Sequence, residues 1–144
     1  MGGFTLFELL MALLIFVVAA ASLVAAQEGC LTLAEGARNL TTAMNGVRER
    51  TEVIRNANFA AIAAMDGTTF TVPGWNVAHM GSIRVDATDT ALLQVFVSIS
   101  WRQKSGRIIG EDVDLDGYDV AEDVSPANGR LDSPASYATL RADI

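Results

Sequence analysis

The sequence has few of the residues that build common catalytic and metal sites. Its 144 residues include one cysteine, one histidine and three prolines. A single cysteine, Cys30, excludes an intrachain disulfide, and we predict that it packs as a small apolar residue in a helix, with an intermolecular disulfide as the alternative. A single histidine, His79, excludes a histidine pair for catalysis or metal binding. We therefore expect His79 in a loop, without a functional role.

Basic residues are also scarce. The chain has ten Lys and Arg against 17 Asp and Glu, a formal net charge of −7. Binding to nucleic-acid phosphates needs clustered Lys and Arg, so this balance argues against a nucleic-acid partner. Neither a glycine-rich phosphate loop nor a nucleophile elbow is present, and Ser133 and Ser136 have no plausible general base. We therefore predict that the chain is not an enzyme.

One long apolar run dominates the start of the chain. From Phe4 to Ala26 the only charged residue is Glu8, and the only other polar side chains are the hydroxyls of Thr5 and Ser22. A helix over these residues is roughly 35 Å long at about 1.5 Å per residue, enough to span a bilayer core. An acidic residue inside such a segment is costly and is normally functional.

The residues around Glu8 resemble a known processing motif. The segment Gly3-Phe4-Thr5-Leu6-Phe7-Glu8-Leu9-Leu10 is similar to the start of type IV pilins and of the pseudopilins of type II secretion. The resemblance implies that a prepilin peptidase cleaves between Gly3 and Phe4 and methylates the new amine of Phe4. It also implies that Glu8 acts in assembly, paired with the Phe4 amine of a neighbouring subunit.

The resemblance also divides the chain into segments. We expect a leader at 1–3, a transmembrane and polymerisation helix at 4–27, its amphipathic continuation at 28–66, and a small β-sheet domain at 67–144 with an acidic loop at 111–132. Family leaders usually carry basic residues before the glycine, and these are missing here. Two alternatives stay open, a start further upstream or an unusually short leader.

Beyond the apolar run, a helical stripe continues at spacings of three and four residues. Its members are Cys30, Leu33, Ala37, Leu40, Met44, Val47, Thr51 and Ile54. The pattern predicts one long helix from about Thr5 to about Ala64, weakened near Gly29, Gly36 and Gly46. A two-helix coiled coil is the weaker alternative, because Ala37 is small and Thr51 polar.

The second half of the chain has strand character. Leu93, Val95, Val97, Ile99 and Trp101 alternate with more polar residues, which predicts a strand over 91–101 with one face on the helix. Shorter strands are expected at 68–72, 82–85 and 107–109, and Trp75, Trp101 and Phe96 are expected in the core or on a sheet face. The predicted fold class is α+β: a long N-terminal helix packed on an antiparallel sheet of three to four strands.

The acidic loop has the spacing of a calcium site. Seven of the thirteen residues from Glu111 to Asp123 are acidic. The pattern resembles the calcium loops of EF-hand and dockerin proteins, which implies side-chain ligands from Asp112, Asp114 and Asp116, a backbone ligand from Tyr118 and a closing acid at Asp123. A solvated acidic loop without a metal ion is the alternative.

A second, less regular copy of this oxygen spacing follows the first. Ser125, Asn128 and Asp132 fit it if one residue is inserted near Pro126. Several type II secretion pseudopilins order a loop near the C-terminus with calcium, and the resemblance implies the same here.

These observations favour a structural role. We expect a subunit of a type IV pilus, a type II secretion pseudopilus or a DNA-uptake pseudopilus, most consistent with a minor pilin or minor pseudopilin. Its partners would be a prepilin peptidase, other pilin or pseudopilin subunits and the assembly platform of the bacterial inner membrane. It would be a single-pass membrane protein with its globular domain outside the cytoplasm, then part of a periplasmic or extracellular filament. The alternative is a membrane-anchored, calcium-dependent binding module with an uncleaved helix, and a secreted enzyme ranks last.

Overall fold

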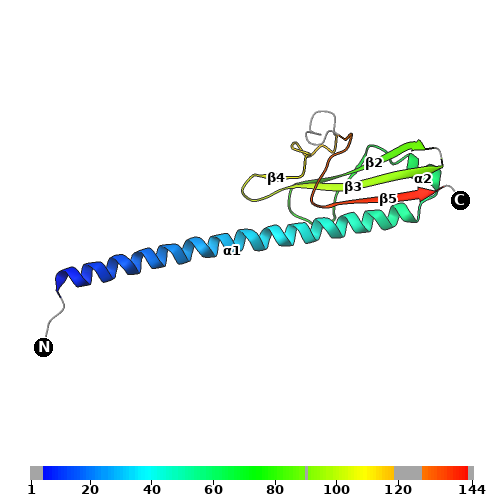
Figure 1. The fold of residues 1–144 in the computed structure, drawn as a ribbon. Coiled ribbons are helices and arrows are strands. Elements are labelled where there is room, and N and C mark those ends of the chain that lie inside the picture. Colours follow the sequence, from blue (N-terminus) through cyan, green and yellow to red (C-terminus); the bar gives the residue numbers. More distant parts are fainter. Residues whose placement is uncertain (1–4, 90, 119–127, 143–144) are drawn as a thin grey trace. The chain divides into compact units, whose positions relative to one another are not determined.

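The structure is a computed structural model that describes residues 5–89, 91–118 and 128–142. The chain separates into two compact units, Met1–Arg38 and Asn39–Ile144, which are described individually. The element order is α1, α2, then strands β1 to β5. Figure 1 shows these elements along the chain. The fold is the predicted one, a long N-terminal helix packed on an antiparallel sheet.

Helix α1 spans Leu6–Arg55. It runs without interruption through Gly29, Gly36 and Gly46, the three positions where weakening was expected. In the first unit its side chains are exposed over nearly the whole length, and Cys30 lies among them as a free, exposed thiol. In the second unit Val47, Thr51 and Ile54 are buried, which confirms the later part of the predicted stripe. Ala43, which is not part of that stripe, is buried as well.

The helical region ends differently from the prediction. Instead of continuing to Ala64, α1 stops at Arg55, and a short helix α2 covers Phe59–Ala63. The cause is Asn58, whose side-chain oxygen accepts a hydrogen bond from the Ala61 N–H at 2.7 Å and so caps a new helix. Asparagine is among the best residues at this position because it satisfies an otherwise unpaired backbone donor.

Within the described residues, five strands form one antiparallel sheet. They are β1 (Thr68–Phe70), β2 (His79–Asp89), β3 (Leu92–Arg102), β4 (Ile108–Ile109) and β5 (Ser136–Ala142). The central strand is β3, which pairs with β2 along one edge and with both β4 and β5 along the other. The prediction of three to four strands therefore missed β5, and it placed the start of β2 too late.

The core lies between the helices and one face of the sheet. Leu93, Val95, Val97, Ile99 and Trp101 of β3 are buried there, as predicted. Burial alternates only in the first half of the strand, because Ser98 and Ser100 are buried as well. Gly46 of α1 permits close packing, because a Cβ at this position would lie 2.4 Å from Val72 Cγ2 and 3.1 Å from Ile99 Cδ1. Phe96 lies between Val95 and Val97 in β3, and the Arg130 guanidinium is 4.2 Å from the centroid of its ring.

His79 does not lie in a loop, as the sequence had indicated, but is the first residue of β2. Its ring lies against Trp75, with 4.4 Å between centroids, and Trp75 in turn lies 6.0 Å from Trp101. The imidazole is therefore part of the packing at this end of the sheet, together with both tryptophans of the chain.

Candidate assembly helix and metal-binding loop

The first turn of α1 carries a reciprocal hydrogen-bond pair. Glu8 Oε2 accepts hydrogen bonds from the Thr5 N–H at 2.9 Å and from Thr5 Oγ1 at 3.0 Å, while the Glu8 N–H donates to Thr5 Oγ1 at 3.3 Å. This is a capping box, in which two residues three apart satisfy donors that a helix N-terminus leaves unpaired. The carboxylate also lies where the helix dipole favours negative charge. This role of Glu8 was not predicted, although the Thr-x-x-Glu spacing is its signal in the sequence.

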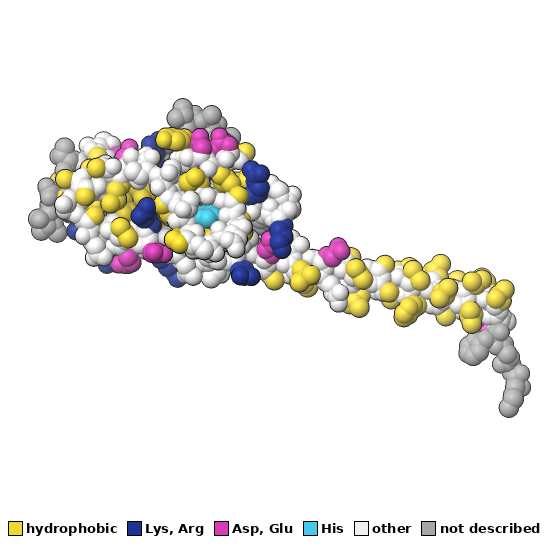
Figure 2. Space-filling view, turned by 180° about the vertical axis from the view of Figure 1, so that it is seen from behind, with side chains coloured by type: hydrophobic (Ala, Val, Ile, Leu, Met, Phe, Trp, Pro, Cys, Tyr) yellow, Lys and Arg dark blue, Asp and Glu magenta, His cyan; other side chains and the backbone are white. Residues whose placement is uncertain are grey.

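The capped segment leads into an apolar surface. From Leu6 to Val24 the large hydrophobic side chains are between 44% and 78% exposed. Figure 2 shows these apolar side chains in yellow along α1. Among the described residues, α1 is the one helix long and apolar enough to cross a membrane. A soluble monomer rarely leaves an apolar surface of this extent uncovered, so lipid or other protein chains are its natural surroundings.

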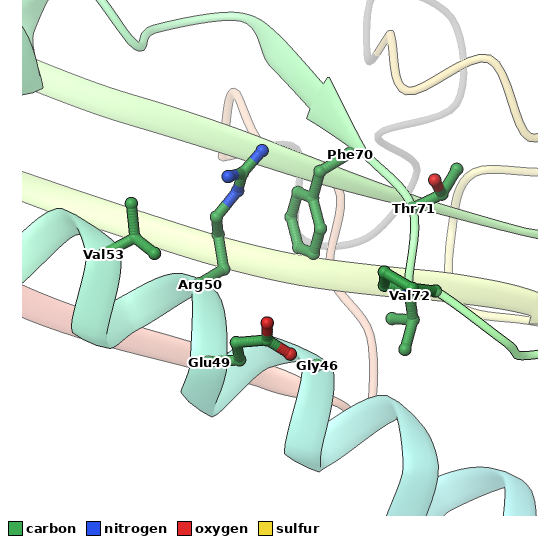
Figure 3. A pocket seen from close by; sticks show the side chains of 8 residues that line it. Gly46, Glu49, Arg50, Val53, Phe70, Thr71 and Val72 are labelled. Atoms are coloured by element: carbon green, nitrogen blue, oxygen red, sulfur yellow. The ribbon is translucent and has the colours of Figure 1, made fainter.

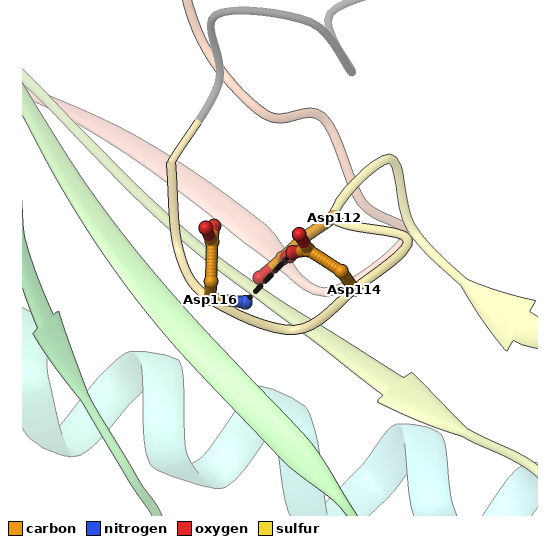
Figure 4. A group of neighbouring side chains, drawn as sticks. All are labelled: Asp112, Asp114 and Asp116. Atoms are coloured by element: carbon orange, nitrogen blue, oxygen red, sulfur yellow. Dashed lines mark hydrogen bonds between the residues drawn. The ribbon is translucent and has the colours of Figure 1, made fainter.

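The acidic loop brings three predicted ligands together. One oxygen from each of Asp112, Asp114 and Asp116 lies within 4.8 Å of the others. Two oxygens bound to one calcium ion at about 2.3–2.6 Å lie at most about 5 Å apart, so these carboxylates fit a shared ion. Figure 4 shows the three side chains gathered within the curve of the loop.

Backbone hydrogen bonds hold this arrangement. Asp112 is only 2% exposed, and its two side-chain oxygens accept from the N–H groups of Asp116 and Gly117, each at 3.1 Å. Asp114 Oδ1 also accepts from the Asp116 N–H at 3.1 Å, and Asp116 Oδ1 accepts from the Tyr118 N–H at 2.7 Å.

The turn after Asp116 depends on a glycine. Gly117 has a φ of 82°, a conformation that side chains with a Cβ rarely adopt. A Cβ there would also lie 2.3 Å from Thr69 Cγ2, so the loop sits directly on β1. This glycine occupies the sixth position of the predicted calcium loop, where a sharp turn is required.

The remaining predicted ligands fall into two groups. Asp123 and Ser125 lie outside the described residues. Asn128 and Asp132 do lie together, since the Asn128 amide nitrogen donates to Asp132 Oδ2 at 2.9 Å. The structure adds Arg130, whose Nε is 3.1 Å from Asp132 Oδ1. Sequence reasoning did not include this cation, which already neutralises the acid of the predicted second site.

Asp132 also connects to the start of the first loop. Its N–H donates to Glu111 Oε2 and its carbonyl accepts from the Glu111 N–H, both at 2.9 Å. The two predicted calcium segments are therefore joined at their outer ends. Nothing in the local sequence indicates this pairing, because the two residues are far apart in the chain.

No family model, curated protein or solved structure matches this chain. The function of the chain is therefore inferred from its residues and its fold. A long apolar N-terminal helix packed on an antiparallel sheet is compatible with a pilin-like subunit. The aspartate loop is compatible with a metal ion.

Proposed function

We propose that the chain is a structural subunit of a type IV pilus-like or type II secretion pseudopilus filament, assembled through its N-terminal helix. The observation that carries the proposal is the exposed apolar surface of α1 directly after a single capped acid, Glu8. A helix that only anchors a domain needs no acid at this depth. In a helix that packs among identical copies, one such acid fixes the register between neighbouring helices.

Two steps precede assembly in this proposal. A prepilin peptidase removes Met1–Gly3 and methylates the amine of Phe4. The Glu8 carboxylate then pairs with the Phe4 amine of a neighbouring subunit, while the aliphatic side chains supply the contact area. The Thr5 N–H and the Thr5 hydroxyl both donate to Oε2 of Glu8, so the capping box orients the carboxylate for this pairing. In an apolar environment a buried charge requires such partners.

Calcium is the proposed cofactor of the same subunit. Three carboxylates within 4.8 Å repel one another, and a divalent cation removes that repulsion. The donor set consists of oxygen atoms, as calcium prefers. Asp112, Asp114 and Asp116 would hold the ion, with the carbonyl of Tyr118 and the carboxylate of Asp123 as further ligands.

Intact mass of the membrane-extracted protein tests the processing step. Co-expression with a prepilin peptidase should remove Met1–Gly3 and add one methyl group, whereas expression with a catalytically inactive peptidase should leave the chain unchanged. A chain that keeps Met1–Gly3 beside the active peptidase, or is cleaved after Ala26, contradicts the filament proposal. Retention would instead favour the membrane-anchored binding module.

A further inference from the structure

The chain contains two Asn-Gly pairs, and the structure places them in different surroundings. Asn45-Gly46 lies inside α1, whereas Asn128-Gly129 lies in the chain before β5, where Gly129 has a φ of 78°. At such a pair the backbone nitrogen of the glycine can attack the side-chain amide carbon, because glycine has no Cβ to obstruct the approach. Inside a helix the hydrogen bonds between residues four apart hold this nitrogen, so the attack is hindered at Gly46.

The side-chain amide of Asn128 is held at both of its polar atoms. Its Oδ1 accepts a hydrogen bond from the Arg130 N–H at 3.1 Å, and its Nδ2 donates to Asp132 Oδ2 at 2.9 Å. The Arg130 side chain also donates from Nε to Asp132 Oδ1 at 3.1 Å, which fixes the orientation of that carboxylate. A hydrogen-bond donor thus faces the amide oxygen, and an acid–base group faces the amide nitrogen.

We propose that Asn128 is a site of self-catalysed modification, at which the asparagine is converted into aspartate and isoaspartate. The Gly129 nitrogen attacks Cγ of Asn128, and the new N–Cγ bond forms as the Cγ–Nδ2 bond breaks. The proton lost by the Gly129 nitrogen passes through water to the departing NH2 group, which leaves as ammonia. A second water molecule then adds to either carbonyl carbon of the cyclic imide and opens it. No electrons are exchanged.

Each neighbouring group has a defined part in this reaction. Negative charge develops on Asn128 Oδ1 during the attack, and the Arg130 N–H stabilises it as the donors of an oxyanion hole do. Asp132 Oδ2 lies within hydrogen-bond reach of the departing nitrogen, where a carboxylate can relay the proton. Asn128 and Asn45 are both exposed, so access to water does not distinguish the two pairs. The local hydrogen bonds do.

The conversion changes the surroundings of Asp132. A carboxylate replaces the amide that donates to Asp132, so repulsion between two negative charges takes the place of a hydrogen bond. Asp132 is also joined to Glu111, because its N–H donates to Glu111 Oε2. Repulsion at residue 128 therefore weakens a contact that connects two segments of the loop region. The Asn128→Asp variant carries the charge of the product and should melt at a lower temperature than the wild type in the presence of a chelator.

Peptide mass spectrometry of the full chain in mild detergent follows both pairs in one sample. After incubation at neutral pH in water labelled with heavy oxygen, Asn128 should convert at least about tenfold faster than Asn45, which corresponds to about 1.4 kcal/mol of barrier. In concentrated urea the two rates should become similar, and Asn128 should convert more slowly than in the folded chain. Asp132→Asn keeps the backbone of the site and should slow the conversion of Asn128, whereas Asp89→Asn, at an acid outside the site, should not.

The outcomes do not depend on filament assembly. If Asn128 in the folded chain converts no faster than Asn45, or no faster than in urea, its hydrogen bonds protect the amide and the proposal is wrong. Products with heavy oxygen that include isoaspartate show the cyclic imide, whereas aspartate alone would mean direct hydrolysis. If Asp132→Asn folds by circular dichroism and converts like Asp89→Asn, the relay is refuted. The comparison of folded and unfolded wild type decides the proposal even if Asp132→Asn fails to fold.

Discussion

His79 Nε2 accepts a hydrogen bond from the backbone N–H of Val72 at 2.8 Å. The other ring nitrogen lies 2.6 Å from the Val77 carbonyl oxygen, so Nδ1 carries the proton and donates. One side chain thereby fixes both ends of the segment 72–77. This segment carries Trp75, and its Val72 and Pro73 line a small cavity beside Arg50 (Figure 3).

The His79 contacts predict a clear effect of substitution. His79→Phe keeps a ring beside Trp75 but leaves the Val72 N–H and the Val77 carbonyl without this partner, which should cost about 1–3 kcal/mol of unfolding free energy. His79→Gln retains one donor and one acceptor and should cost less. Urea unfolding of the full chain in mild detergent, followed by tryptophan fluorescence, measures both. Equal midpoints for wild type and His79→Phe would contradict the bracing role.

Gly46 offers a second test of packing. Alanine usually favours a helix interior over glycine by about 1 kcal/mol. At Gly46, however, the new methyl group would lie 2.4 Å from Val72 Cγ2. Overpacking of this kind costs about 1–3 kcal/mol, so we expect Gly46→Ala to lower stability despite its better propensity.

Two further variants control the Gly46 experiment. Gly29 has no atom within 4 Å of an added Cβ, so Gly29→Ala should leave stability unchanged or raise it. Val72→Ala removes the methyl groups that an alanine at position 46 would contact. In a Val72→Ala background, Gly46→Ala should therefore cost less stability than it does in the wild type. A Gly46→Ala chain as stable as Gly29→Ala would show that the helix and segment 72–77 do not pack this closely.

The pKa of Asp86 should depend on Thr88. The Thr88 hydroxyl and, secondarily, its N–H donate to Asp86 Oδ1 and lower the pKa of that carboxyl below its usual value. Thr88→Val removes the hydroxyl and should raise the pKa, whereas Thr88→Ser should keep it low. Because the folded-state pKa is lowered, the contribution to stability is present above the ordinary carboxyl pKa and is lost as the pH falls through the folded value. A carboxyl carbon NMR titration measures the shift, and identical midpoints for Thr88→Val and wild type would refute it.

Calcium should raise the melting temperature of the wild-type chain. An ion that binds only the folded state adds about 2.7 kcal/mol when its concentration is 100 times Kd. Asp114→Asn should abolish this gain and, in the presence of a chelator, should melt no lower than wild type, because it relieves repulsion within the cluster. Asp89→Asn, at an acid outside the loop, should respond to calcium normally. If millimolar calcium neither releases heat nor raises the melting temperature of the wild type, the metal site is wrong.

Mutations can distinguish the role of Glu8 in assembly from the role of Thr5 in the capping box. Glu8→Ala should insert into the membrane but assemble poorly, and Glu8→Gln should behave alike because it cannot form an ion pair with an amine. Thr5→Val loses the hydroxyl contacts of the capping box but keeps the carboxylate, so it should assemble better than either. Filament yield by shearing and immunoblotting measures assembly. Equal defects in Thr5→Val and Glu8→Ala would mean that Glu8 acts only as a cap.

The features that sequence predicted correctly are those set by local patterns. The apolar run and the stripe that ends at Ile54 required only helical spacing, and the burial of Val95 and Val97 followed from alternation along one strand. The Asp112–Asp116 cluster likewise lies within one turn of chain, so its spacing alone indicated the geometry.

The features that sequence missed depend on distant residues. Strand β5 is exposed at nearly every position and has no burial alternation of its own, so its strand form comes from pairing with β3. The Glu111–Asp132 bonds likewise join residues 21 positions apart. The Arg130–Asp132 pair, by contrast, is local, because the two residues are two positions apart. The end of α1 at Arg55 could have been predicted from the sequence, because Asn58 is a strong capping residue for the next helix.

Because β5 pairs with β3, the long connection from Arg102 to Ser136 has to close into a loop before the sheet is complete. The entropic penalty of bringing β5 back falls when this connection is shortened by an internal link. The Glu111–Asp132 bonds form one such link, and an ion at Asp112, Asp114 and Asp116 would order the chain beside it. An ion bound there would therefore lower the entropic cost of completing the sheet through β5.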